Sequence, residues 1–186
     1  MTRLLLVRHA RPAAGFAEQL DPGLDDVGAH QARAAADRLE GRGPLAILTS
    51  PLRRAVETAA PLAARWGVTP VVEPAVGEIP SPAGGLADRG GWLRELLAAR
   101  WPEIEAELGE WRERLLATVG ALAEETVVFT HFVAISTVVG AATGDDRVVT
   151  CSPTHTSLTE LEVVGGRLEL RAAPDSGRPE RLDPAG

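Results

Sequence analysis

The N-terminal stretch LLLVRHARP, from Leu4 to Pro12, places four apolar residues directly before an arginine and a histidine. A short and almost wholly apolar run is typical of a strand covered on both faces, so we predict a strand from Arg3 to Val7. No small-residue cleavage site follows the run, and we therefore interpret it as a strand and not as a signal peptide. A buried strand that ends on Arg8 and His9 raises the question of what these two side chains do.

Composition narrows the range of functions. The chain has 186 residues and a net charge of −7, which suits one domain and disfavours nucleic acid or an anionic membrane as a partner. All 19 basic residues are arginine, which excludes a P-loop lysine, a Schiff-base lysine and a Ser-Lys dyad. Cys151 is the only cysteine, so we expect no internal disulfide and a cytoplasmic location. No apolar run is long enough to span a bilayer.

Strand and helix patterns alternate along the chain. We therefore predict an α/β fold, a three-layer sandwich with a mainly parallel central sheet and helices on both faces. A Pro- and Gly-rich segment at 74–91 is predicted to be a loop. One domain covers 1–173, and 174–186 form a disordered tail. Predicted strands are 3–7, 44–49, 68–72 and 126–130, with a hairpin of 157–163 and 167–172. The first predicted helix is 25–40, which Asp25 or Asp26 would cap. The others are the segment after an N-cap at Ser50 (Pro61 kinking or interrupting it), 92–100, 102–123 and the segment from 132 that ends at Gly144.

Arginines and histidines stand at the ends of three predicted strands. The first strand ends at Arg8-His9, the second ends just before Ser50 and the pair Arg53-Arg54, and the fourth ends at His131. Ligands of open α/β sheets bind at the carboxyl ends of strands, where these side chains would converge. Arginine donors match phosphate oxygens, and helix N-termini add N–H donors. The pattern predicts a pocket for a small phosphorylated metabolite.

Four motifs in order resemble one family. LLLVRHARP is similar to the Arg-His-Gly motif of the histidine phosphatase superfamily, which is also called phosphoglycerate mutase-like. LDDVGAHQA (24–32) resembles its Leu-Thr-x-x-Gly-x-x-Gln-Ala segment, SPLRRAVETA (50–59) resembles its Ser-x-Leu-x-Arg-Ala-x-x-Thr-Ala box, and VVFTHFVAI resembles the strand with its second histidine. The resemblance covers residues 4–161. It implies a metal-independent phosphatase that hydrolyses a small phosphate monoester through a phosphohistidine, with no cofactor.

The resemblance also implies a role for each residue of the site. His9 would be the nucleophile, Arg8 and Arg54 would bind the phosphoryl oxygens, and His131 would be the second pocket histidine. Glu78 would be the acid that protonates the leaving group, with Glu73 as the alternative. On chemical grounds His9 must attack as neutral imidazole, so its other ring nitrogen should donate to a fixed acceptor. The predicted site includes no metal ligand, and it does not include His30 or His155.

Two residues depart from the family pattern. Ala10 replaces the glycine after the first histidine, which would be unfavourable if that position required a positive φ. Phe132 replaces the glycine after the second histidine, where its ring would either narrow the pocket or turn into the core. Three alternatives to the phosphatase function stay open: a cofactor-dependent phosphoglycerate mutase, a protein phosphohistidine phosphatase and a catalytically idle anion-binding module. Whether the chain forms a homodimer is also open.

Overall fold

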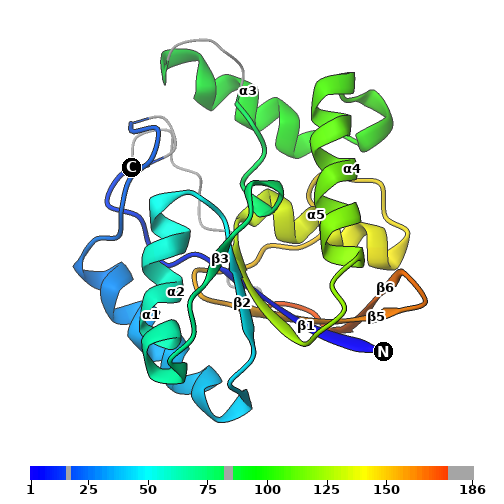
Figure 1. Ribbon diagram of the computed structural model, residues 1–186. Coiled ribbons are helices and arrows are strands. Elements are labelled where there is room, and N and C mark those ends of the chain that lie inside the picture. The colour runs from blue at the N-terminus through cyan, green and yellow to red at the C-terminus, as the bar shows by residue number, and fades with distance from the viewer. Residues whose placement is uncertain (16–17, 82–85, 176–186) are drawn as a thin grey trace.

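One mixed sheet forms the centre of the computed structural model, which describes residues 1–15, 18–81 and 86–175. Within these residues the sheet has six strands in the order β3-β2-β4-β1-β5-β6 (Figure 1). The predicted α/β fold with a mainly parallel sheet is therefore confirmed. The strands are β1 (Thr2–Arg8), β2 (Ala46–Thr49), β3 (Val71–Val72), β4 (Thr126–Thr130), β5 (Leu158–Val164) and β6 (Arg167–Ala172).

Strand direction determines where the functional side chains meet. Strands β3, β2, β4 and β1 are parallel to one another, so their carboxyl ends lie along one edge of the sheet. Strand β5 runs antiparallel to β1, with Val7 opposite Leu158. The residues just before β5 therefore lie beside the residues that follow β1.

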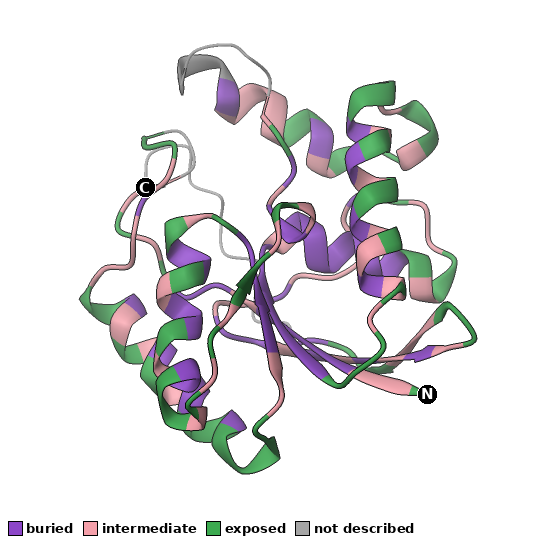
Figure 2. Cartoon of the chain, viewed as in Figure 1, coloured by how far each residue is buried: buried purple, intermediate pink, exposed green. Residues whose placement is uncertain are grey.

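Helices cover both faces of the sheet (Figure 1). On β1, Leu5 and Val7 pack into a core cluster with α1 and α2, whereas Leu4 and Leu6 pack into a second cluster with α4 and α5. This alternation follows from the two-residue period of a strand, and it places the central strands among the most buried parts of the molecule (Figure 2). The helices are α1 (Asp26–Leu39), α2 (Arg53–Trp66), α3 (Leu86–Ala98), α4 (Ala106–Gly120) and α5 (Phe132–Thr143).

Several element ends follow the local sequence signals. Asp25 caps α1, because its carboxylate accepts a hydrogen bond from the Gly28 N–H. Gly144 ends α5 in the left-handed conformation, with φ of 72°. Gly165 and Gly166, at φ of 58° and 80°, form the tight turn between β5 and β6. These three predictions are confirmed.

Other boundaries differ from the prediction. The segment 74–91 is not a continuous loop, since α3 already begins at Leu86; its residues 82–85 lie outside the described part of the chain. Gly90 and Gly91 are weak helix formers, and each lowers the stability of a helix by only about 1 kcal/mol relative to alanine. Burial of Arg89 and Leu96 on the same helix offsets this loss. Helix α4 begins at Ala106 because Pro102 belongs to a separate 3₁₀ turn, and α2 continues through Pro61 without interruption.

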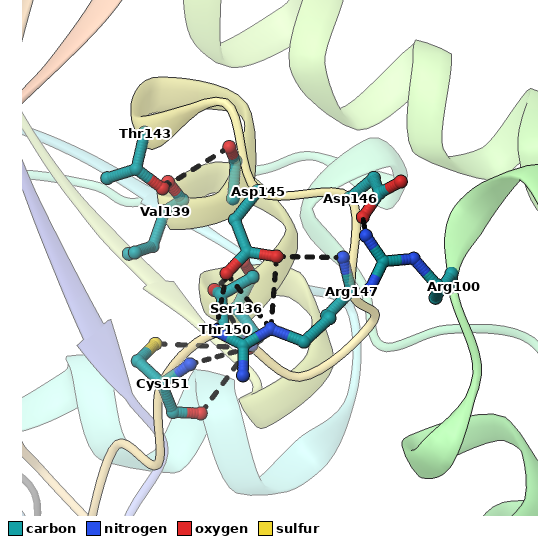
Figure 3. A network of polar contacts seen from close by, with 10 residues as sticks. Arg100, Ser136, Val139, Thr143, Asp145, Asp146, Arg147, Thr150 and Cys151 are labelled. Carbon is teal, nitrogen blue, oxygen red and sulfur yellow. Dashed lines mark hydrogen bonds and ion pairs between the residues drawn. The ribbon is translucent and has the colours of Figure 1, made fainter.

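The segment between α5 and β5 is held by polar contacts (Figure 3). Arg147 pairs with Asp145 at 2.5 Å, and the Thr150 N–H donates to the Ser136 hydroxyl of α5 at 2.8 Å. Thr150 also donates its own hydroxyl to the Ser136 carbonyl at 2.7 Å. The segment that leads into β5 is therefore fixed to α5, the helix that follows the carboxyl end of β4.

The last described residues run past the same edge. The Thr154 N–H and hydroxyl both donate to the carbonyl of Asp175, and the predicted tail lies from 176 onward outside the described residues. Within the described residues, no helix has both the length and the apolar composition needed to cross a bilayer.

Candidate active site

Three neighbouring strands bring the predicted site residues together. His9 follows β1 and His131 follows β4, and the two backbones join where the His9 N–H donates to the Thr130 carbonyl at 2.9 Å. Ser50 follows β2, and its N–H donates to the Phe129 carbonyl at 3.0 Å. Strand β4 lies between β2 and β1 (Figure 1). His131, at the end of β4, therefore stands between Ser50 and His9 at the carboxyl edge of the sheet.

His9 is held as a neutral imidazole with one nitrogen able to accept. Its side chain is only 6% exposed, and Nδ1 lies 2.8 Å from the Ala10 carbonyl oxygen. A carbonyl oxygen only accepts, which assigns the ring proton to Nδ1 and leaves the Nε2 lone pair available. Burial lowers the pKa of His9 well below 6.5, and the charges of His131, Arg8 and Arg54 lower it further. The geometry thus provides the fixed acceptor that a nucleophilic His9 requires.

Arg54 lies against the accepting nitrogen of His9. Its Nε–H donates to His9 Nε2 at 3.3 Å from the first turn of α2, and the residue is 8% exposed. Burial lowers the pKa of Arg54, while the nearby carboxylates of Glu78 and Asp21 oppose the shift. The adjacent Arg53 instead points to solvent and pairs with Glu57 at 3.1 Å. Of the two arginines in the sequence box, Arg54 is the one that enters the pocket.

Arg8 and Phe132 form a stacked pair. The guanidinium of Arg8 lies 5.3 Å from the centroid of the Phe132 ring, and its Nη1 donates to the Pro153 carbonyl at 2.9 Å. Phe132 also packs against the core cluster beneath α5. The ring that replaces the usual glycine therefore supports the arginine from below.

His131 is fully buried beside His9. The two ring centroids are 5.1 Å apart, and His131 Nε2 lies 2.7 Å from the Ser50 hydroxyl oxygen. Burial lowers the pKa of His131 well below 6.5, and the charges of Arg54 and Arg8 add to this effect. Among the described residues, none forms a hydrogen bond with His131 Nδ1.

Ser50 has a different position from the one predicted. It is not the N-cap of α2, because Pro51 and Leu52 intervene and the helix begins at Arg53 with an extended Leu52 at the cap position. Its hydroxyl accepts from the Leu52 N–H at 3.2 Å and contacts His131. A serine hydroxyl can satisfy either a helix end or a neighbouring side chain, and here the tertiary contact with His131 prevails.

The two acid candidates lie in different surroundings. Glu78 accepts from the Val133 N–H at 3.3 Å, in the first turn of α5 beside His131, and from its neighbour Ile79 at 3.0 Å. Burial raises the pKa of Glu78, although both N–H bonds and the charges of Arg54 and Arg8 partly offset the rise. Glu73 instead caps the turn at Ala75, to which it is bonded at 2.9 Å. Of the two, Glu78 is the carboxylate that contacts α5 beside His131, and the charges of Arg54 and Arg8 act on it.

The beginning of α1 holds the backbone that follows His9. Arg11 pairs with Asp25 at 2.6 Å, and its N–H donates to the Gln31 side chain at 2.8 Å. Gly28 lies so close to the Arg11 carbonyl that an added Cβ would overlap it. The Gly and Gln of this segment therefore face the loop that follows His9. Ala10 has no positive φ, so alanine there carries no backbone strain.

Two residues of the pocket region are not among the predicted site residues. His155 lies with its ring centroid 5.6 Å from that of His9, and Arg89 of α3 is 6% exposed with its charge acting on Arg54. Arg89 falls in the segment that was expected to be a loop. No sequence signal distinguishes it from other arginines, whereas His155 could be placed only once β5 was known to lie beside β1.

Comparison with known proteins identifies the family. A family model described as histidine phosphatase superfamily (branch 1) matches residues 4–176. The chain belongs to the histidine phosphatase superfamily. Glucosyl-3-phosphoglycerate phosphatase of Mycolicibacterium vanbaalenii is 44% identical over 69 residues, a match that spans 35% of this chain but only 31% of that protein.

Solved structures share the fold over nearly the whole chain. The structure of Bacillus stearothermophilus YhfR has a TM-score of 0.79 at 22% identity, and the match covers 95% of this chain and 98% of that chain. Phosphoserine phosphatase of Entamoeba histolytica in complex with 3-phosphoglyceric acid has a TM-score of 0.74 at 19% identity, and the match covers 96% of this chain and 98% of that chain. Mycobacterial glucosyl-3-phosphoglycerate phosphatase has a TM-score of 0.69 at 24% identity, and the match covers 95% of this chain and 100% of that chain. These likenesses confirm the fold.

Proposed function

We propose that this protein is a phosphatase that hydrolyses a small phosphate monoester through a phosphohistidine on His9, without a metal ion. The observation that carries the proposal is the state of His9: a buried neutral ring whose Nδ1–H is bonded to the Ala10 carbonyl and whose Nε2 lone pair faces Arg54. Membership of the histidine phosphatase superfamily and the names of several relatives support the same chemistry. The proposed substrate is a small phosphorylated metabolite.

The first step transfers the phosphoryl group to the enzyme. His9 Nε2 attacks phosphorus while the bond from phosphorus to the ester oxygen breaks, and the proton stays on Nδ1, which continues to donate to the Ala10 carbonyl. Arg8, Arg54 and His131 stabilise the charge on the equatorial oxygens. Glu78 gives its proton to the departing oxygen, for which its raised pKa is suited.

The second step restores the enzyme. Glu78, now a carboxylate, takes a proton from a water molecule that attacks phosphorus, and the bond from phosphorus to His9 Nε2 breaks. Inorganic phosphate leaves, and Glu78 is protonated again for the next cycle. The reaction needs no second copy of the chain and no cofactor. Because the chain has a single cysteine and needs no disulfide, we place the reaction in the cytoplasm.

The test is release of phosphate from p-nitrophenyl phosphate in the presence of EDTA. The native protein should turn over, and His9→Ala should fall to the background rate while keeping its circular dichroism spectrum. His30→Ala is the matched control, because His30 is exposed on α1 and should leave the rate unchanged. A fully active His9→Ala protein would refute the mechanism. Exchange between phosphate isomers without free phosphate would instead indicate a mutase.

A further inference from the structure

A third histidine lies beside the proposed nucleophile. Because β5 is antiparallel to β1, the residues before Leu158 lie past the carboxyl end of β1. His155 is one of them, and its ring centroid is 5.6 Å from that of His9, with 46° between the ring planes. His9 is thus flanked by His131 on the β4 side and by His155 on the β5 side.

The loop that carries His155 is fixed at both ends. Before it, Thr150 is bonded to Ser136 of α5 through both its N–H and its hydroxyl (Figure 3). Nearer the site, the Pro153 carbonyl accepts from the Arg8 guanidinium at 2.9 Å. After it, the Thr156 N–H donates to the Arg8 carbonyl at 3.0 Å. The position of His155 is therefore tied to Arg8 from two directions.

The backbone next to His155 is strained. Thr156 has φ of 58°, and within the described residues it is the one non-glycine residue with a positive φ. This region is unfavourable for a β-branched residue, so the surroundings must hold it there. Thr156 is 7% exposed, and its carbonyl accepts from Arg38 of α1 at 2.8 Å. Strain of this kind is concentrated at functional sites, where it fixes a side chain in one orientation.

We propose that His155 is a third substrate-contacting histidine, which donates a hydrogen bond to an oxygen of the phosphoryl group held at His9. This inference rests on the proposed function, since it concerns the same pocket. Rings whose centroids are 5.6 Å apart are close enough for both to reach one phosphoryl group. His131 differs from His155 because it is fully buried and its Nε2 contacts Ser50, whereas His155 is partly exposed.

The experiment measures binding of inorganic phosphate by calorimetry together with kcat/KM for p-nitrophenyl phosphate. His155→Ala should weaken phosphate binding and lower kcat/KM, each by about tenfold or more, because a hydrogen bond to a charged group is lost. His155→Gln should recover most of both, since an amide can still donate. His30→Ala is the control and should match the native protein. Native values of both quantities in a folded His155→Ala protein would overturn the proposal.

The two readouts separate this inference from the proposed function. If the native protein binds phosphate but releases none from the ester, the phosphatase proposal fails while the binding arm still decides the role of His155. If phosphate binding and turnover are both absent in the native protein, both proposals are wrong. If His155→Ala does not fold, His155→Gln and His155→Phe decide: the amide should retain phosphate binding and the ring without a donor should lose it. Equal binding in these two variants would refute a donated hydrogen bond.

Discussion

The protonation states of His9 and Glu78 are set in opposite directions. Burial keeps His9 neutral by lowering its pKa, and burial keeps Glu78 more protonated by raising its pKa. A proposed nucleophile needs its lone pair, and a proposed acid needs its proton. The same desolvation therefore prepares both groups, because it disfavours whichever form is charged.

Replacing Glu78 by Gln tests this arrangement at the level of one residue. We expect kcat/KM for an alkyl phosphate to fall by about 10²- to 10⁴-fold, since an alkoxide leaves only with a proton. The loss should be much smaller for p-nitrophenyl phosphate, whose leaving group is stable as an anion. A comparison of rates for the two esters measures the effect.

Glu73→Gln provides the matched control, because the Glu73 carboxylate caps a turn at Ala75, whereas that of Glu78 accepts from Val133 of α5. It should reduce the two rates equally or not at all. A selective loss on the alkyl ester in Glu73→Gln, with none in Glu78→Gln, would assign the acid to Glu73. That result would contradict the role proposed for Glu78.

At the scale of elements, the beginning of α1 supports the loop after His9 through Gly28. Gly28→Ala should destabilise the fold by about 1–3 kcal/mol, because the new Cβ meets the Arg11 carbonyl and backbone must move. Denaturant unfolding measures the change. The displacement of Arg11 should also lower kcat, since His9 is two residues away.

Gly109→Ala is the control for this substitution. Gly109 lies within α4 with open space where a Cβ would stand, so alanine should stabilise the protein by about 0.5–1 kcal/mol. Equal effects of the two substitutions would show that helix propensity, and not the contact with Arg11, governs position 28.

Element prediction succeeded where the signal was local. Asp25 caps α1 and Gly144 ends α5 because each effect depends on a few adjacent residues. The predicted N-cap at Ser50 was wrong, because its hydroxyl contacts a histidine that follows another strand. The predicted loop was wrong where α3 begins, because packing overrides two glycines. Tertiary contacts decided both cases, and no local pattern contains them.

At the scale of the whole molecule, sheet order determines the site. The sequence predicts which strands end in Arg8, His9 and His131, but not that β4 lies between β2 and β1. That order brings the ring centroids of His9 and His131 to 5.1 Å from each other. The antiparallel strand β5 places His155 on the other side of His9. The predicted site residues therefore lie together, and the structure adds His155 and Arg89, which are not among them.

The buried histidines also make stability depend on pH. The pKa values of His9 and His131 are lowered well below 6.5, so the unfolded chain binds more protons than the folded one between the folded pKa and about pH 6.5. The contribution of each histidine is complete above pH 6.5 and is lost as pH falls, at up to about 1.4 kcal/mol per pH unit. Glu78 opposes this trend, since its raised pKa favours the folded state at lower pH.

Two histidines with large shifts outweigh one carboxyl, so the melting temperature should fall from pH 7.5 to pH 5.0. Calorimetry in phosphate-free buffers measures the fall, because bound phosphate would itself stabilise the folded state. His131→Gln should show a smaller fall, since one of the two groups no longer titrates. His30→Ala should show the native fall, because His30 is exposed. A fall in His131→Gln as large as in the native protein would show that other groups govern the acid sensitivity, and that burial of His131 as a neutral ring is not its cause.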